Sequence, residues 1–358
     1  MNRSDVLYRN VLALQRCRMH HTVLDYMPSY YWIEPTNMCN LRCVMCPNGA
    51  GLVSIPKGFM SMEQYRRILR AITPHASTVV LAVGGESLLH PDIFDMIALA
   101  EASGIKIHLN TNATLLDRDR AMALLDTGIT SISFAFDGFT PKMYENVRRG
   151  ADFITTRENI LTFLRLKKER KAQKPYCVLS ILRLGITEYR EEEKQAFLHG
   201  FNGMIDEIRM RDVASWGSTF KDTKAFNIRK HEGTFPPCGR LWSTFCIAWN
   251  GDVLPCIYDT NHEYVLGNVF ETPMEYIWNN AKYLTLRRSM EDGSYLQQMP
   301  LCENCIVIGT PKIVGVPSGI RLTLADAAGN YLGPGFESTL LRVVNIFRRN
   351  NFSSTRIA

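Results

Sequence analysis

Three cysteines near the N-terminus carry the strongest chemical signal in the sequence. Cys39, Cys43 and Cys46 are separated by three residues and then by two residues. Thiolates are soft ligands that suit iron–sulfur clusters and zinc. A four-iron cluster held by three cysteines keeps one iron open, and by analogy with zinc enzymes an open metal position suits catalysis. A structural zinc site with a fourth ligand from elsewhere in the chain is the alternative.

A second set of cysteines lies in the C-terminal third of the chain. It consists of Cys238, Cys256, Cys302 and Cys305, the last two separated by two residues. Four thiolates close an iron–sulfur cluster, which then suits electron transfer rather than substrate binding. The same spacing also allows a four-cysteine zinc site.

A regular alternation of strands and helices must position the first cysteines. Apolar and β-branched runs predict strands at 30–34, 78–83, 106–110, 130–136, 176–184 and 207–213. Helical patterns lie at 3–26, 93–102, 117–128 and 188–201, another begins at residue 61, and the stretch 153–174 contains a long helix. Strands that alternate with helices indicate a parallel sheet. Six units end near residue 213, and a closed eight-unit barrel usually needs about 250 residues. We therefore expect an α/β fold, an open partial (β/α)6 TIM-like barrel with the cysteines after its first strand.

The alternation stops near Trp216, and a smaller α+β domain is predicted beyond it. There, Asn250-Gly251 is a strong hairpin signal between two apolar runs. The predicted organisation is an N-terminal helix at 1–29, the barrel at 30–216, a linker at 217–237, an iron–sulfur domain at 238–310 and a tail at 311–358 with a basic amphipathic helix.

The first cluster resembles the signature of the radical S-adenosylmethionine (SAM) superfamily, which is Cys-x3-Cys-x2-Cys. The residue before the third cysteine is often aromatic in that family, and here it is Met45. The resemblance implies that the open iron of a [4Fe-4S] cluster binds the amino and carboxylate groups of SAM. One electron then cleaves SAM to methionine and a 5′-deoxyadenosyl radical, which abstracts a hydrogen atom from the substrate.

Later positions resemble the family's SAM contacts. Gly84, Gly85 and Glu86 end the second strand, like the Gly-Gly-Glu motif that contacts the SAM amino group, and a carboxylate beside an ammonium group is a favourable pair. The positions that resemble those near the SAM ribose and carboxylate are Asn110, Asn112, Ser133 and Asp137. Ordinary polar side chains at turns and strand ends are the alternative for all of these.

The second cluster resembles the SPASM/Twitch extension of radical SAM enzymes. The stretches 250–252, 266–269, 276–279 and 286–288 match that extension. A full SPASM domain continues with further cysteines, and this chain has none after Cys305. The resemblance therefore implies the shorter Twitch type, with one auxiliary [4Fe-4S] cluster on Cys238, Cys256, Cys302 and Cys305.

Three further residues are candidates for catalysis or substrate binding. Cys246 lies between two predicted ligands and could donate a hydrogen atom to a substrate radical, as a thiol does in radical SAM epimerases. It could also be a spare cluster ligand or a buried core residue, which is how we interpret Cys17 and Cys177. Arg209 and Arg211 alternate on the sixth strand and share one face. That face is either the barrel interior, where arginine would hold a carboxylate, phosphate or hydroxyl group, or the solvent side.

Composition excludes several classes of protein. The chain has 358 residues, 46% of them hydrophobic and 21% charged, as in soluble globular proteins. A net charge of +6 does not predict nucleic-acid binding, which needs a clustered basic face. Residues 1–26 lack the apolar core of a signal peptide, and no apolar run is as long as a transmembrane segment. We expect a cytoplasmic protein, since in a reducing compartment grouped cysteines favour metal.

The four-cysteine Twitch pattern most resembles the dehydrogenases of aminoglycoside biosynthesis, which oxidise a secondary alcohol to a ketone. The leading hypothesis is therefore a radical SAM oxidoreductase acting on an alcohol of a sugar-like or aminocyclitol small molecule. An external donor such as flavodoxin or ferredoxin would supply electrons. An epimerase that uses Cys246 comes second and a ribosomal-peptide-modifying enzyme third. A non-catalytic iron–sulfur or zinc protein is the alternative outside enzymes.

Overall fold

The centre of the molecule is a nine-stranded sheet in the order β11-β10-β9-β1-β3-β4-β5-β7-β8. The computed structural model describes residues 3–185, 188–213, 216, 220, 238–303, 305, 308, 316, 320, 323 and 324. Its main strands are β1 (Tyr30–Ile33), β3 (Thr78–Leu81), β4 (Lys106–Thr111), β5 (Ser131–Ala135), β7 (Tyr176–Arg183), β8 (Glu207–Asp212), β9 (Thr244–Ile247), β10 (Asp252–Leu254) and β11 (Gly267–Asn268). A separate pair consists of β2 (Arg42–Cys43) and β6 (Arg148–Arg149).

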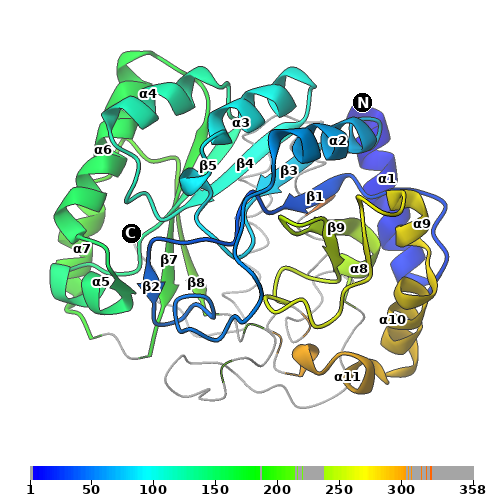
Figure 1. Ribbon diagram of the computed structural model, residues 1–358. Helices are drawn as coiled ribbons and strands as arrows, with labels where there is room; N and C mark the ends of the chain where they lie inside the picture. The colour runs from blue at the N-terminus through cyan, green and yellow to red at the C-terminus, as the bar shows by residue number, and fades with distance from the viewer. Residues whose placement is uncertain are drawn as a thin grey trace.

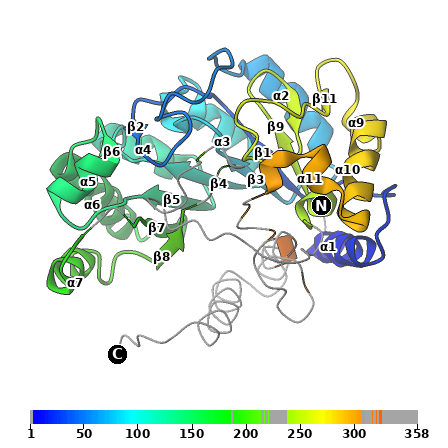
Figure 2. The same ribbon diagram turned by 90° about the horizontal axis from the view of Figure 1, so that it is seen from below.

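The six strands from β1 to β8 in this sheet are parallel to their neighbours. Helices cover the outside of the arc that they form (Figure 1; Figure 2). These are α2 (Met62–Ile72), α3 (Ile93–Ala102), α4 (Arg118–Asp126), α5 (Pro141–Val147), α6 (Phe153–Glu169) and α7 (Glu191–His199). The predicted α/β partial barrel of six units is therefore confirmed.

Alternation along the strands separates an outer face from an inner face. On β4, Ile107 and Leu109 are buried in the main core. His108 and Asn110, which alternate with them, are only partly buried. Successive side chains of a strand point to opposite faces of the sheet. The outer face thus packs under the helices, and polar side chains of β4 lie on the inner face.

The C-terminal domain is joined to the barrel, which the sequence did not reveal. Strand β9 is the first strand of the predicted hairpin, and it pairs in parallel with β1, Tyr30 opposite Thr244. Only β10 and β11 run antiparallel beyond it. All four residues of β9 are buried, as expected for a strand inside a parallel sheet. Short helices complete this domain: α8 (Arg240–Ser243), α9 (Met274–Trp278), α10 (Ala281–Asp292), α11 (Tyr295–Gln298) and the 3-10 turn η2 (Pro300–Cys302).

The N-terminal helix is shorter than predicted. Helix α1 spans Arg3–Arg18, whereas the pattern had predicted a helix to residue 26. The chain turns at His20, which has a φ of 55°, and then follows the C-terminal domain. The Tyr26 hydroxyl donates a 2.8 Å hydrogen bond to the carbonyl of Trp242, and the Trp242 indole donates one to His21. These contacts hold residues 20–26 in an irregular path.

Two predicted segments lie outside the described residues. They are most of the linker at 217–237 and the basic helix within the tail at 311–358. In the part of the chain that the structure describes, no helix combines the length and apolar character needed to cross a membrane.

Candidate active site

The first three cysteines lie on a loop at the C-terminal end of β1. The pairing of β2 with β6 places Cys43 opposite Arg148 and anchors the middle of this loop. The pKa of Cys43 is raised to about 12, chiefly by burial; the Arg148 guanidinium opposes this shift, and the Cys46 and Cys39 thiols add to it. Both of the other thiols are therefore near enough to Cys43 to affect its charge.

This donor set fits an iron–sulfur cluster. Among the described residues, no three His, Cys, Asp or Glu side chains are close enough to hold a single metal ion. The loop nevertheless supplies three interacting thiols, and thiolates are the ligands that iron–sulfur clusters take. Cys39, Cys43 and Cys46 would hold the cluster, which supplies the electron for SAM cleavage when it is bound.

Buried contacts join the cysteine loop to the end of β3. The Glu34 carboxylate, on a residue that is 2% exposed, accepts hydrogen bonds from the amides of Gly84 at 2.8 Å and Trp249 at 3.2 Å. Gly85 lies so close to the loop that a Cβ would collide with the carbonyl oxygen of Thr36 and lie 2.5 Å from that of Met38. Glycine is therefore required at residue 85 for this approach.

Glu86 lies at the expected place, but its carboxylate is held by the protein. It is 3% exposed and accepts hydrogen bonds from the Thr111 hydroxyl at 2.8 Å, the Asn112 amide at 2.7 Å and the Leu88 amide at 3.1 Å. Burial raises the pKa of Glu86, and these hydrogen bonds oppose that shift. These contacts tie Glu86 to the loop after β4, and its contact with the SAM amino group remains a prediction.

The two asparagines after β4 have different surroundings. The Asn112 amide group donates a 3.0 Å hydrogen bond to Asn40, within the cysteine loop. Asn110 lies 3.1 Å from the ring of His108 on the inner face. Asn112 thus lies beside the predicted cluster ligands, whereas Asn110 lies on β4 next to His108.

Asp137 forms a buried ion pair that the sequence did not predict. Its carboxylate accepts a 2.6 Å hydrogen bond from Arg148 and a 2.7 Å hydrogen bond from the Leu182 amide. Both charged side chains are buried, with 1% exposure for Asp137. The other terminal nitrogen of Arg148 lies 4.0 Å from the Cys43 sulfur. Asp137 therefore fixes a cation beside a cluster ligand, and its expected contact with SAM remains a prediction.

The inner wall at β7 and β8 is polar and contains both arginines. Arg211 donates a 2.8 Å hydrogen bond to the Ser180 hydroxyl of β7, and Arg209 forms a 2.6 Å ion pair with Glu207. Burial and the charge of Arg209 together lower the pKa of His108 to about 4.

Arg209 is partly buried and Arg211 is exposed, whereas the residues that alternate with them, Ile208 and Met210, pack against the main core. Alternation along β8 therefore places both arginines on the inner face of the sheet.

Ser133 lies on the same wall. The register places it opposite Asn110 of β4 and Val178 of β7. Its side chain is buried, so a contact with SAM also remains a prediction.

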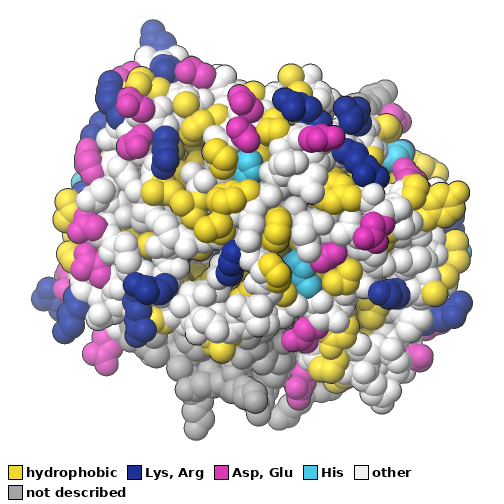
Figure 3. All heavy atoms as spheres, in the orientation of Figure 1, with side chains coloured by type: hydrophobic (Ala, Val, Ile, Leu, Met, Phe, Trp, Pro, Cys, Tyr) yellow, Lys and Arg dark blue, Asp and Glu magenta, His cyan; other side chains and the backbone are white. Residues whose placement is uncertain are grey.

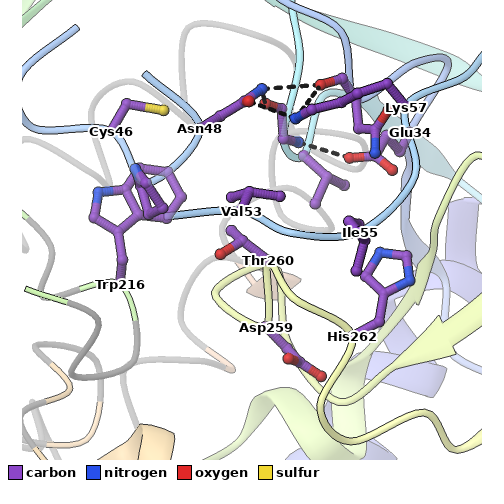
Figure 4. Close-up of a pocket in the computed structure, with 14 residues that line it drawn as sticks. Glu34, Cys46, Asn48, Val53, Ile55, Lys57, Trp216, Asp259, Thr260 and His262 are labelled. Carbon is purple, nitrogen blue, oxygen red and sulfur yellow. Dashed lines mark hydrogen bonds between the residues drawn. The ribbon is translucent and has the colours of Figure 1, made fainter. Parts of the chain in front are cut away.

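A cavity lies between the cysteine loop and the C-terminal domain (Figure 4). Cys46 and Asn48 line it from the loop, and Trp216, Asp259 and His262 line it from the opposite side. The amine of Lys57 donates a hydrogen bond to the Asn48 side chain at its edge. A ligand in this cavity would touch both halves of the molecule.

The four C-terminal cysteines lie near enough to one another for their charges to interact. Burial raises the pKa of Cys302 well above its usual range, and the charges of Cys305, Cys238 and Cys256 raise it further. Four interacting thiols fit an auxiliary iron–sulfur cluster. The Arg240 guanidinium donates a 3.2 Å hydrogen bond to the Cys256 sulfur.

Cys246 lies on β9 opposite Leu254, which is two residues before Cys256 in the chain, and burial and then the charge of Cys256 raise its pKa. It is 3% exposed and belongs to a small apolar cluster with Ala248 and Leu254. It does not line the cavity. Its role as a hydrogen-atom donor therefore has no support from its surroundings.

The exposed surface beside the cavity is mixed in charge. On the face shown in Figure 3, Lys and Arg side chains are scattered among Asp and Glu. A nucleic-acid surface would instead gather basic side chains on one face or stripe.

Two family profiles match the chain. The profile of the radical SAM superfamily matches residues 33–194, and that of the SPASM iron–sulfur cluster-binding domain matches residues 238–306. The chain thus carries a radical SAM domain followed by a SPASM iron–sulfur domain. The radical SAM domain implies a [4Fe-4S] cluster and SAM as cofactors, and the SPASM domain implies auxiliary iron–sulfur clusters.

Relatives cover most of the chain at low identity. The AdoMet-dependent heme synthase of Methanosarcina barkeri is 26% identical in an alignment of 339 positions that covers 84% of this chain and 93% of that protein. Two solved structures share the fold. BtrN in complex with AdoMet and 2-DOIA is 18% identical, with a TM-score of 0.54 over 81% of this chain and 98% of that one. Streptococcus suis SuiB bound to precursor peptide SuiA is 17% identical, with a TM-score of 0.62 over 83% of this chain and 75% of that one.

Proposed function

We propose that this radical SAM enzyme is a dehydrogenase that oxidises a secondary alcohol of a sugar-like or aminocyclitol small molecule. The observation that carries the proposal is the iron–sulfur cluster-binding domain matched over residues 238–306, which contains Cys238, Cys256, Cys302 and Cys305. Four protein thiolates leave no iron for substrate, so a cluster on them suits electron transfer. A small external protein such as flavodoxin or ferredoxin would reduce the first cluster, in a reducing cytoplasm.

The oxidation balances with an acceptor of this kind. The substrate carbon loses a hydrogen atom to the 5′-deoxyadenosyl radical. The remaining carbon radical loses one electron to the auxiliary cluster and one proton from its hydroxyl group to water or a base, which gives a ketone. The polar inner wall of Ser180, Arg209 and Arg211 supplies donors for the hydroxyl groups of such a substrate.

A second candidate is oxidation of a carboxylate-bearing substrate of the haem-precursor kind. Two arginines on the inner wall suit carboxylates, and the Methanosarcina barkeri relative named as a heme synthase matches 84% of this chain. An epimerase is less well supported because Cys246 is buried in a small apolar cluster and does not line the cavity. Modification of a ribosomal peptide has the support of fold likeness alone.

The test separates SAM cleavage from product formation. The anaerobically reconstituted enzyme is incubated with SAM, a reductant and either aminocyclitol alcohols or Fe-coproporphyrin III. Formation of 5′-deoxyadenosine and of the oxidised product is then measured. We expect a ketone from an aminocyclitol, one per SAM cleaved. Product from the porphyrin alone would favour the second candidate.

The Cys302→Ala variant tests the acceptor. It should still cleave SAM, since Cys39, Cys43 and Cys46 are intact, and it should lose most of the oxidised product. The Cys246→Ala variant is the matched control, because it removes a buried thiol of the same domain and should keep both activities. A full product yield from Cys302→Ala would refute the proposed acceptor.

A further inference from the structure

Arg240 lies among the auxiliary cysteines. It is the first residue of α8, two residues after Cys238, and its Nη1 donates a 3.2 Å hydrogen bond to the Cys256 sulfur. Its guanidinium carbon stands 5.2 Å from the centre of the Tyr258 ring. One side chain thus contacts a ligand sulfur with its donor and an aromatic face with its plane.

The position of Arg240 is determined from both sides. Cys256 and Tyr258 stand two residues apart just after β10, and the arginine reaches both of them. A guanidinium stays charged in proteins and presents donors in a fixed planar arrangement. A cation above an aromatic face gains further stabilisation when it is shielded from water. The donor is therefore aimed at the sulfur rather than free to turn to solvent.

A fixed positive charge beside a cluster favours its reduced form. Reduction adds one negative charge to the cluster, and hydrogen bonds to ligand sulfurs together with local net charge set iron–sulfur potentials. A charge-assisted hydrogen bond strengthens when its acceptor becomes more negative. The contact between Arg240 and Cys256 is thus stronger in the reduced state.

We propose that Arg240 raises the reduction potential of the auxiliary cluster, so that this cluster takes the electron of the substrate radical. Arg240 is a positioning and tuning residue that does not touch substrate. The electron balance is one electron gained by the cluster for each one lost by the substrate radical, with a proton released from the substrate. The inference rests on the proposed function, in which the auxiliary cluster is the acceptor.

The same side chains connect this centre to the cavity. Tyr258 makes an edge-on contact with Trp216 at 5.5 Å between ring centres, and Trp216 lines the cavity that Cys46 also lines. Arg240 therefore contacts a tyrosine that itself touches a residue lining the cavity.

The test measures the potential of the auxiliary cluster alone. The full chain carries Cys39→Ala, Cys43→Ala and Cys46→Ala to remove the catalytic cluster, and is reconstituted with iron and sulfide. An electron paramagnetic resonance redox titration then compares Arg240 with Arg240→Gln and Arg240→Lys. The control is Arg288→Gln, which removes an exposed arginine of the same domain. Iron content is measured for every variant.

We expect Arg240→Gln to lower the ratio of reduced to oxidised cluster at least tenfold at a fixed potential, which is 59 mV for one electron. Arg240→Lys should fall between glutamine and the wild type, because lysine keeps the charge without the planar donor set. Arg288→Gln should leave the potential unchanged.

A wild-type potential in either loaded Arg240 variant overturns the inference. If Arg240→Gln does not assemble its cluster, the Arg240→Lys result decides. Absence of iron from the parent triple variant would instead refute the auxiliary cluster, and with it the proposed function.

Discussion

Arg148 lies at the predicted cluster site, although no sequence motif marks it. It is buried with Asp137 and lies 4.0 Å from the Cys43 sulfur. Removing one partner of a buried ion pair leaves an uncompensated charge and typically costs about 3–5 kcal/mol. We expect Arg148→Gln to lower the free energy of unfolding by about that amount, measured by urea denaturation at pH 7.

The neighbouring arginine supplies the control for this prediction. Arg149 is exposed, and exposed substitutions usually change stability by about 0.5 kcal/mol or less. Equal losses in Arg148→Gln and Arg149→Gln would contradict the account of a buried ion pair.

His108 makes stability depend on pH in a definite direction. Burial and the charge of Arg209 lower its pKa to about 4 in the folded protein, against about 6.5 when unfolded. As pH falls, His108 therefore takes up its proton in the unfolded chain before it does so in the folded protein. The contribution of neutral His108 to the free energy of unfolding is present above pH 6.5 and is lost as pH falls towards 4. The loss is on the order of 1 kcal/mol per pH unit.

The measurement compares the wild type with His108→Gln by urea denaturation at pH 7 and pH 5. The wild type should lose more stability than the variant between the two values. The same loss in both proteins would show that His108 is not held neutral.

At the scale of elements, the contact between the end of β3 and the cysteine loop determines the shape of that loop. A Cβ at residue 85 would collide with the Thr36 carbonyl, whereas one at residue 84 would lie 2.9 Å from Glu34 Oε1, an atom at the end of a side chain. Overpacking against backbone typically costs about 1–3 kcal/mol. We expect Gly85→Ala to lose iron from the first cluster and to keep the auxiliary iron.

Gly84→Ala is the milder neighbour, because the Glu34 side chain can shift. It should keep more iron than Gly85→Ala under the same reconstitution. The opposite order of iron content would mean that the close approach at residue 85 does not shape the cysteine loop.

Strong local patterns were sufficient to predict most elements. Helix α3 has the predicted bounds, and β3, β4 and β7 lie within two residues of theirs, because each has a continuous or alternating apolar pattern. The stretch 153–174, predicted to contain a long helix, contains α6 as far as Glu169; the charged residues that follow have no apolar face to bury. Helix α5 was missed, although Thr140 caps it and Pro141 opens it.

Tertiary partners set the limit of prediction at the site. The cysteine spacing is local and could be read directly. The hydrogen bonds that Glu86 accepts from Thr111 and Asn112 depend on how β3 and β4 meet. The hydrogen bond from Arg240 to the Cys256 sulfur depends on a turn after β10. No sequence spacing encodes those distances. The alternation of Arg209 and Arg211 predicted a shared face, and only the neighbouring strands favour the inner one.

At the scale of the molecule, both groups of cysteines are connected to strands of the same sheet. Strand β9 pairs with β1, so the first cysteine loop and the strand that leads to Cys256 leave neighbouring positions. The cavity between them is lined from both sides. This arrangement suits a reaction that begins at one cluster and delivers an electron to the other.

The most direct measurement of the central claim is the iron and zinc content per chain after anaerobic reconstitution. The wild type should hold about eight irons, and the Cys39, Cys43 and Cys46 triple alanine variant about four. Those values would establish an open catalytic cluster beside a closed auxiliary cluster. About four irons that fall to none, with about one zinc retained in both proteins, would contradict the account, because the C-terminal site would then be structural.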